Sequence, residues 1–230
     1  MKNHLHWCMD SCRWDVFEEA NAPNMKARTE FRKVYSRAGF TPPSLFSTFM
    51  NCSWYNSGND RPIPSLPVWG WIPRDLQEKG YHTVFISSNP LMKHYEQRFT
   101  GFNEFIYIDD CRYHAHEIVE KVKRIYDTVE QPKYIFLLLM ETHQPYFYLK
   151  QHTQEYVTAN YRPITRQVKA VESIDADFGV MMKTIDGTDT DVLIFSDHGD
   201  LDLKLDGAQG HGEHMFHIKL FEIPLGRFTA

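Results

Sequence analysis

Residues 191–200 constrain the fold more than any other part of the chain. They read DVLIFSDHGD, so an apolar run ends abruptly in a carboxylate, an imidazole and a glycine. Such a run is typical of a buried strand in a parallel sheet, and ligands bind at the carboxyl tips of these strands. Asp197 and His198 together suit Zn²⁺, Mn²⁺ or a similar cation. The alternative is an ordinary turn in which Asp and Gly serve the backbone.

Apolar patterns elsewhere alternate between strand and helix. We expect strands over residues 5–9, 82–87, 105–108, 134–140 and 192–196, with weaker candidates at 34–36 and 220–225. Helices are expected over residues 43–50 and 117–129, at 75–79 before Gly80, and between Pro163 and Gly187; residues 51–70 and 199–217 should be loops. The alternation predicts an α/β fold with a mostly parallel sheet and helices on both faces.

Length and composition indicate one globular domain over residues 1–230. The net charge of -5 and the lack of a Lys/Arg cluster argue against a nucleic-acid partner. No apolar stretch is long enough for a membrane anchor, and the N-terminus does not resemble a signal peptide. The four cysteines form no CxxC pair, which predicts reduced thiols and a cytoplasmic location; they are Cys8, Cys12, Cys52 and Cys111.

Three predicted strands end in polar side chains. Asp10 follows the first strand, residues 141–143 follow the strand at 134–140, and Asp197 with His198 follows the strand at 192–196. The carboxyl ends of parallel strands meet at one edge of a sheet, so Asp10, Asp197 and His198 could be three ligands of one metal ion. Taken alone, Asp10 could equally be a helix N-cap or a loop carboxylate.

Thr41 is the candidate nucleophile, because it stands where a loop turns into the helix expected at residues 43–50. Helix N-termini attract anions, and a hydroxyl that touches a cation there loses its proton more easily. The alternative is that Thr41 only caps the helix.

A histidine-rich loop, GHGEHMFH at residues 210–217, offers further ligands. It does not match the zinc-protease motifs. His211 or His214 could bind a second metal or a substrate oxyanion, whereas His217 is interpreted as a packing residue. His143 directly follows an apolar strand, so it is a candidate catalytic or substrate-binding residue.

In this order, the segments resemble the sulfatase branch of the alkaline phosphatase superfamily over residues 5 to about 225. The matching segments are DSCRWD at 10–15, APNM at 22–25, TPPS at 41–44, the helix and strand at 76–89, THQPY at 142–146, SDHGD at 196–200 and GHG at 210–212.

The resemblance implies an alkaline phosphatase-like three-layer sandwich, with a C-terminal subdomain that is minimal or absent. It also implies one or two divalent metal ions, Zn²⁺ or Mn²⁺ before Ca²⁺ or Mg²⁺, held by Asp10, Asp197 and His198 and touched by Thr41. His143 and His211 would hold a second cation or contact the substrate.

Two departures from the family pattern narrow the expected activity. Sulfatases convert a Cys or Ser into formylglycine and continue the motif with Arg, whereas this chain has Thr41 and Leu45. Threonine cannot give that aldehyde. The resemblance therefore favours a hydrolase or transferase of small phosphate esters or diesters. The alternatives are a degenerate, non-catalytic protein that binds a metal or a partner, and a sulfate-ester hydrolase.

Overall fold

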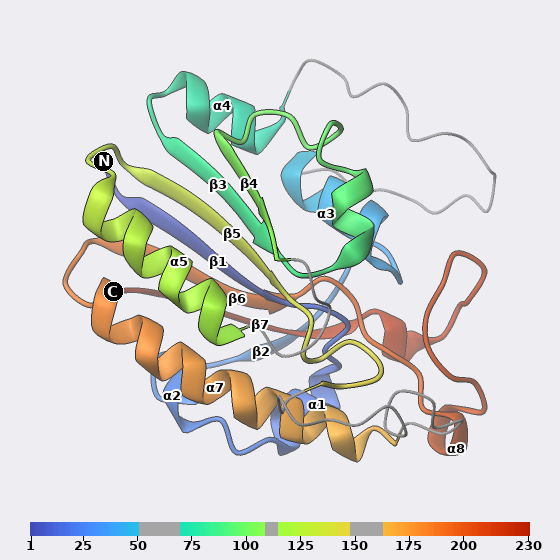
Figure 1. Cartoon of the computed structure of the whole chain (residues 1–230). Helices are drawn as coiled ribbons and strands as arrows, with labels where there is room; N and C mark the ends of the chain where they lie inside the picture. The colour runs from blue at the N-terminus through green and yellow to red at the C-terminus, as the bar shows by residue number, and fades with distance from the viewer. Residues whose placement is uncertain (51–69, 109–114, 148–162) are drawn as a thin grey trace.

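A seven-stranded sheet forms the centre of the computed structural model, which describes residues 1–50, 70–108, 115–147 and 163–230 (Figure 1). Its strands are β1 (Asn3–Met9), β2 (Arg32–Tyr35), β3 (His82–Ser87), β4 (Glu104–Tyr107), β5 (Lys133–Leu139), β6 (Thr190–Ser196) and β7 (Glu222–Thr229). The order across the sheet is β2-β7-β6-β1-β5-β3-β4.

Five neighbouring strands, from β6 through β4, are parallel, while β7 is antiparallel to both β6 and β2. The mostly parallel sheet expected from the sequence is therefore confirmed. In the register, Met9 lies opposite Leu139 on one side and Ser196 on the other. The residues that follow β1, β5 and β6 consequently emerge at one level of one sheet edge.

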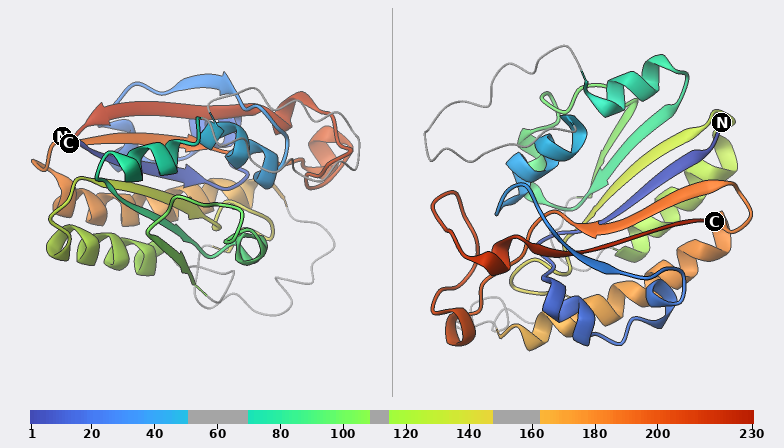
Figure 2. Two further views of the ribbon diagram at one scale, coloured as in Figure 1. Left: turned by 90° about the horizontal axis from the view of Figure 1, so that it is seen from above. Right: turned by 180° about the vertical axis from the view of Figure 1, so that it is seen from behind.

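Helices cover both faces of the sheet, and Figure 2 shows the layers from two further sides. The helices are α1 (Trp14–Glu19), α2 (Pro23–Lys26), α3 (Thr41–Met50), α4 (Ile72–Glu78), α5 (Ala115–Thr128), α7 (Thr165–Ile185) and α8 (Leu203–Asp206), with short 3-10 turns η1 (Pro90–His94) and η2 (Ile218–Leu220). The long helices α5 and α7 pack side by side on one face together with α1 and α2, and α3 and α4 lie on the other.

The side chains of the central strands divide the core into two halves. On β1, Trp7 faces α7, where its ring meets Phe178 edge to face, whereas Cys8 faces the α3 side. Phe49 of α3 packs there against Phe136 of β5. Because neighbouring strand residues point to opposite faces, an uninterrupted apolar strand such as β5 supports both helical layers at once.

The structure differs from the sequence expectations in several places. Helix α3 begins at Thr41 itself rather than after it. The last strand is β7, at Glu222–Thr229 instead of residues 220–225, because η2 turns the chain first and β7 then follows β6 to its start. The expected loop at 199–217 contains the one-turn helix α8, and residues 51–69 of the other expected loop lie outside the described residues.

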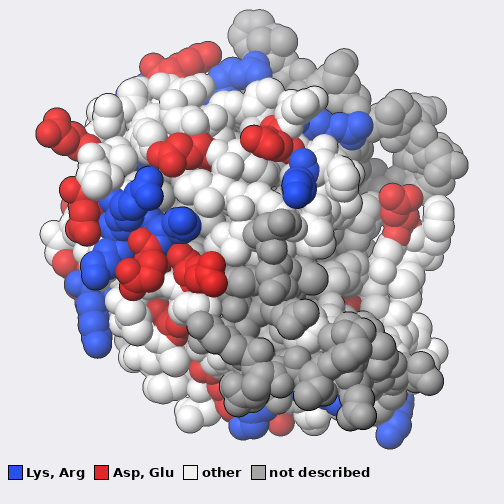
Figure 3. Space-filling view, in the orientation of Figure 1, with Lys and Arg blue, Asp and Glu red and all other residues white. Residues whose placement is uncertain are grey.

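The helices, the surface charges and the cysteines can be compared with the expected cytoplasmic location. Within the described ranges, no helix combines the length and apolar character that a membrane span requires. On the face in Figure 3, basic and acidic side chains lie interspersed over the described surface. Cys8 and Cys12 are buried free thiols, whereas Cys52 and Cys111 lie outside the described residues. The cytoplasmic location stays a prediction.

Candidate active site

Asp10, Asp197 and His198 meet at the carboxyl edge of the sheet, as their positions after β1 and β6 predicted. One potential ligand atom from each lies within 4.8 Å of the others. His198 Nε2 is 3.8 Å from Asp10 Oδ1 and 3.5 Å from Asp197 Oδ2. All three side chains are buried, with at most 1% of each residue exposed. This group combines carboxylate oxygens with an imidazole nitrogen in a buried site.

Hydrogen bonds fix the imidazole of His198 in one orientation. Its Nδ1 lies 2.7 Å from the carbonyl oxygen of Gly199 and its Nε2 lies 3.1 Å from the hydroxyl oxygen of Thr41. Burial, aided by the charge of His211, lowers the pKa of His198 to about 3, so the ring is neutral. With Nδ1–H donated to the carbonyl, the lone pair lies on Nε2, the form in which histidine binds metals.

The two carboxylates are held by neighbouring groups, but one oxygen is left over. Asp197 Oδ1 accepts the backbone N–H groups of Ser11 and His198, at 3.0 and 2.9 Å. Asp197 Oδ2 is buried and has no hydrogen-bond partner among the described residues. Burial, together with the nearby charge of Asp10, raises the pKa of Asp197. An unpaired buried oxygen beside a second carboxylate fits a cation, and this donor set suits Zn²⁺ or Mn²⁺.

Thr41 is the first residue of α3, and its hydroxyl is within hydrogen-bond distance of His198 rather than capping the helix. The two following residues are Pro42 and Pro43, which have no N–H. The N-terminus of α3 therefore offers an anion fewer backbone donors than a helix start usually does. The attraction of this helix start for an anion therefore depends mainly on the helix dipole.

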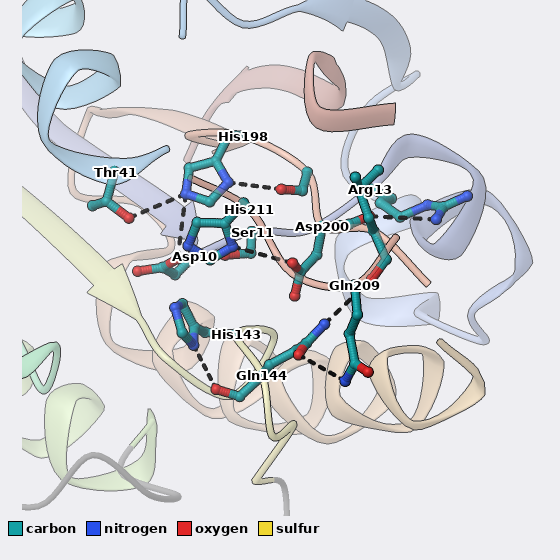
Figure 4. Close-up of polar contacts among 12 residues, drawn as sticks. Asp10, Ser11, Arg13, Thr41, His143, Gln144, His198, Asp200, Gln209 and His211 are labelled. Atoms are coloured by element: carbon teal, nitrogen blue, oxygen red, sulfur yellow. Dashed lines mark hydrogen bonds and ion pairs between the residues drawn. The ribbon is translucent and has the colours of Figure 1, made fainter. Parts of the chain in front are cut away.

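A pocket of about 390 Å³ opens beside Thr41. The residues that line it include the polar His143, His211 and Asn89 and the more apolar Leu91 and Tyr95. The imidazole centre of His211 lies 4.3 Å from that of His198 and 4.9 Å from that of His143 (Figure 4). The pocket thus brings two further imidazoles to the side of the nucleophile candidate.

The structure distinguishes between the two histidines that the sequence left as alternatives. His211 lines the pocket, and although burial acts to lower its pKa, the hydrogen bond with Asp200 raises it overall. His214 is exposed and is not among the residues that line this pocket. The expected contact of His214 with substrate therefore gains no support. His217 is half-buried and accepts the backbone N–H of Lys219 at the start of η2.

Several supporting residues were not identified from the sequence. Ser11 has a positive φ of 64° and donates its hydroxyl to Asp10 Oδ1 at 2.7 Å. Asn89, which follows β3, donates its side-chain N–H to Asp10 Oδ2 at 2.8 Å. Gln167 of α7 donates to the carbonyl oxygens of Ser11 and Thr142. Of these three residues, only Asn89 could have been suspected from the sequence, because it is a polar residue just past a predicted strand.

Arg13 fastens the loop that follows His198. Its guanidinium is buried and forms ion pairs with Asp15, at 2.7 Å, and with Asp206 of α8, at 2.6 Å. It also donates to the carbonyl oxygen of Asp200 at 3.3 Å. The polar loop at 199–217 is therefore tied to the start of α1 instead of extending freely.

Comparison with known proteins places this geometry in a family. The family model described as Sulfatase matches residues 9–222. No curated protein matches the chain. The fold resembles the C-terminal periplasmic domain of EcEptC from Escherichia coli, with a TM-score of 0.73 and 15% identity over 100% of this chain and 72% of that one. A structure of the same domain in complex with Zn aligns at a TM-score of 0.73 and 14% identity, over 100% and 73% of the two chains.

Two further solved structures share the fold. An alkaline phosphatase superfamily protein from Vibrio parahaemolyticus aligns at a TM-score of 0.70 and 17% identity, over 99% of this chain. The lipoteichoic acid synthase LtaP from Listeria monocytogenes aligns at 0.67 and 15%, over 98%. The chain spans only 60% and 65% of these two structures. The family match over residues 9–222 shows that the chain, whose fold resembles that of the alkaline phosphatase superfamily protein, belongs to the sulfatase family.

Proposed function

We propose that this chain is a metal-dependent hydrolase or transferase of phosphate esters or diesters, with Thr41 as its nucleophile. The observation that carries the proposal is the position of the Thr41 hydroxyl. It lies 3.1 Å from His198 Nε2, beside two buried carboxylates, and it borders the 390 Å³ pocket. Membership of the sulfatase family supports chemistry on sulfate or phosphate esters in general, and the residue at position 41 favours phosphate.

A divalent cation held by Asp10, Asp197 and His198 would supply the positive charge that favours the ionised hydroxyl and offsets charge on a phosphoryl oxygen. The Zn complex of the Escherichia coli domain supports a cation of this kind. Because Nε2 of His198 would then be occupied, the proton of Thr41 needs another acceptor. His143 and His211 line the same pocket and are placed to take it.

The proposed reaction has two steps. The Thr41 oxygen attacks phosphorus in line, its bond to phosphorus forms as the ester P–O bond breaks, and the leaving alcohol gains a proton from the pocket. Water or an acceptor alcohol then attacks the phosphothreonine, and the Thr41 oxygen regains a proton. Water would release phosphate, or a monoester from a diester, whereas an alcohol would form a new ester. Positioning and charge neutralisation supply most of the rate.

The surroundings of Leu45 support phosphate over sulfate as the substrate. Sulfatases that use formylglycine resemble this chain in the motif at 41–44 but continue with Arg. Leu45 is fully buried and packs in the apolar cluster that contains Phe46 and Phe49. It therefore contributes no charge to the pocket, and Thr41 cannot yield the aldehyde. A sulfate-ester hydrolase that uses formylglycine would need Cys or Ser in place of Thr41.

Mass spectrometry during turnover tests the proposal. With p-nitrophenyl phosphate and bis(p-nitrophenyl) phosphate as probes and Zn²⁺ or Mn²⁺ added, phosphate should accumulate on Thr41 when the second step is slowed. Thr41→Ala should abolish activity, and Thr41→Ser should retain part of it because the hydroxyl is kept. Full activity in Thr41→Ala refutes the mechanism.

The same assays separate the alternatives. Turnover of p-nitrophenyl sulfate alone would identify a sulfate-ester hydrolase. Stoichiometric binding of metal with no turnover of any ester would identify a degenerate member of the fold.

A further inference from the structure

The carboxylate of Asp200 is fully buried and joins two parts of the pocket wall. Its Oδ1 lies 3.1 Å from Nδ1 of His211, and its Oδ2 accepts the hydroxyl of Tyr146 at 3.2 Å. Tyr146 is itself fully buried. Each carboxylate oxygen therefore has its own partner, one on the loop at 210–212 and one on the turn after β5.

The turn that carries Tyr146 also carries His143. The backbone N–H of Tyr146 donates to the carbonyl oxygen of His143 at 2.7 Å. Gln144 in this turn donates to the carbonyl oxygen of Leu201 at 3.3 Å. The side chain of Gln209 in turn donates to Gln144 Oε1 at 3.2 Å (Figure 4). The two loops that bear the pocket imidazoles thus share one network, with Asp200 at its centre.

Packing alone does not explain why the carboxylate of Asp200 is buried. Removing a charge from water is expensive, and an apolar side chain of similar volume often stabilises a protein as well or better. Tyr146 also has a φ of 63°, a conformation that non-glycine residues rarely adopt. Costs of this kind gather at functional sites.

We propose that Asp200 is a positioning residue that acts through His211, an inference that rests on the proposed function. By accepting Nδ1–H, the carboxylate turns the other ring nitrogen, Nε2, toward Asp10 and His198 (Figure 4). There Nε2 can accept the proton that Thr41 loses, or, when it carries hydrogen, donate to a phosphoryl oxygen. The hydroxyl of Tyr146 holds the carboxylate in place for this task. Partners that orient functional histidines in this way typically contribute about 10-fold to 100-fold when they are removed.

Substitution of Asp200 by Asn and by Leu tests the proposal. Asn keeps an oxygen that can accept Nδ1–H, whereas Leu has a similar volume and no acceptor. With bis(p-nitrophenyl) phosphate, Asp200→Leu should lower kcat about 10-fold to 100-fold while KM changes less than about twofold. Asp200→Asn should recover most of kcat. Equal losses in both variants, or a loss that appears only in KM, would overturn positioning through a hydrogen bond.

Asp202→Asn provides the matched control. Asp202 is another buried acid in the same loop, but it accepts the backbone N–H groups of Lys204 and Leu205 at the start of α8 and that of Ile164. This variant should lower the melting temperature with little change in kcat. If it lowers kcat as much as Asp200→Leu does, the effect belongs to loop stability and the proposal fails.

Two further measurements show whether Asp200 acts through His211. In a double-mutant cycle, Asp200→Leu should cost little extra in a His211→Ala background; additive losses would contradict the proposal. In ¹⁵N-histidine spectra, Nδ1 of His211 should carry hydrogen in the wild type and in Asp200→Asn and change its shift in Asp200→Leu. The spectra need no turnover, so unchanged Nδ1 shifts refute positioning, while inactivity of every variant and of the wild type refutes the proposed function instead.

Discussion

Binding of a divalent cation should stabilise this protein against unfolding. The substitution Asp197→Asn should remove this stabilisation without making the metal-free protein less stable. Asp10 and Asp197 place oxygens within 4.8 Å of each other in a buried site. At that distance, two unit charges repel by about 3.5 kcal/mol when the effective dielectric constant is about 20. A bound cation removes this penalty, and in its absence only protonation can relieve it.

Metal should therefore raise the free energy of unfolding of the wild type but not that of Asp197→Asn. At a metal concentration of about 100 times Kd, binding contributes about 2.7 kcal/mol to the free energy of unfolding. For a domain of this size, this corresponds to a rise in melting temperature of about 5–10 °C. In Asp197→Asn, the amide oxygen can still accept the N–H groups that Asp197 Oδ1 accepts now. The metal-free variant should be at least as stable as the metal-free wild type, with its response to metal lost.

Calorimetric melting with and without EDTA, followed by Zn²⁺ or Mn²⁺, measures both effects, and metal analysis after dialysis gives the stoichiometry. Asp191→Asn is the matched control, because Asp191 lies on the same strand, β6, near its opposite end. It should bind metal like the wild type. The reasoning is refuted if Asp197→Asn keeps the full metal-induced shift, or if metal-free Asp197→Asn melts well below the metal-free wild type.

Three shorter predictions concern the scaffold. Phe49→Ala should lower the free energy of unfolding by about 3–5 kcal/mol in urea denaturation, because the ring is fully buried among other aromatic side chains; a loss below 1 kcal/mol would contradict this packing. Gly199→Ala should lower the melting temperature sharply, since its added Cβ would lie 1.9 Å from the carbonyl oxygen of Lys219; an unchanged melting temperature would show that this approach is looser. Asp15 has its pKa lowered to about 2, because Arg13 outweighs the opposing effect of burial. Its contribution is present above pH 4 and lost as the pH falls toward 2, so Asp15→Asn should flatten the acid limb of a stability profile, and an unchanged limb would refute the assignment.

Secondary structure could be predicted where the apolar pattern was strong. The apolar run at β5 indicates a buried strand and the three-to-four spacing along α7 indicates a helix, and both elements form close to the expected residues. The end of the chain was placed less well. Residues 220–225 have strand character, but the position of β7 is set by pairing with β6 and β2, as in the contact of Asp191 with Thr229. Pairing between distant segments cannot be read from local pattern.

The proximity of the candidate site residues was predictable for a topological reason. Asp10 and Asp197 come directly after strands that the sequence identifies, and the carboxyl ends of neighbouring parallel strands lie at one level. The supporting residues were not predictable in this way. Ser11 donates its backbone N–H to Asp197, and Gln167 reaches the backbone of Ser11 from helix α7. No spacing in the sequence indicates that these residues meet. The effect of Pro42 and Pro43 could have been inferred, because proline lacks an N–H wherever it stands.

Metal binding and catalysis are separable in this site, and the distinction decides how each experiment is read. The buried carboxylates of Asp10 and Asp197 lie close enough to repel each other, and Arg13 is paired with Asp15 and Asp206. A protein of this fold that had lost its activity would still gain from a cation there. Metal content and thermal stabilisation therefore test the Asp-Asp-His group and say nothing of turnover. Thr41 is different, since its hydroxyl is not required for two carboxylates and an imidazole to bind a cation. A variant that loses only this hydroxyl, keeps its metal and loses all turnover would link the metal centre to covalent catalysis.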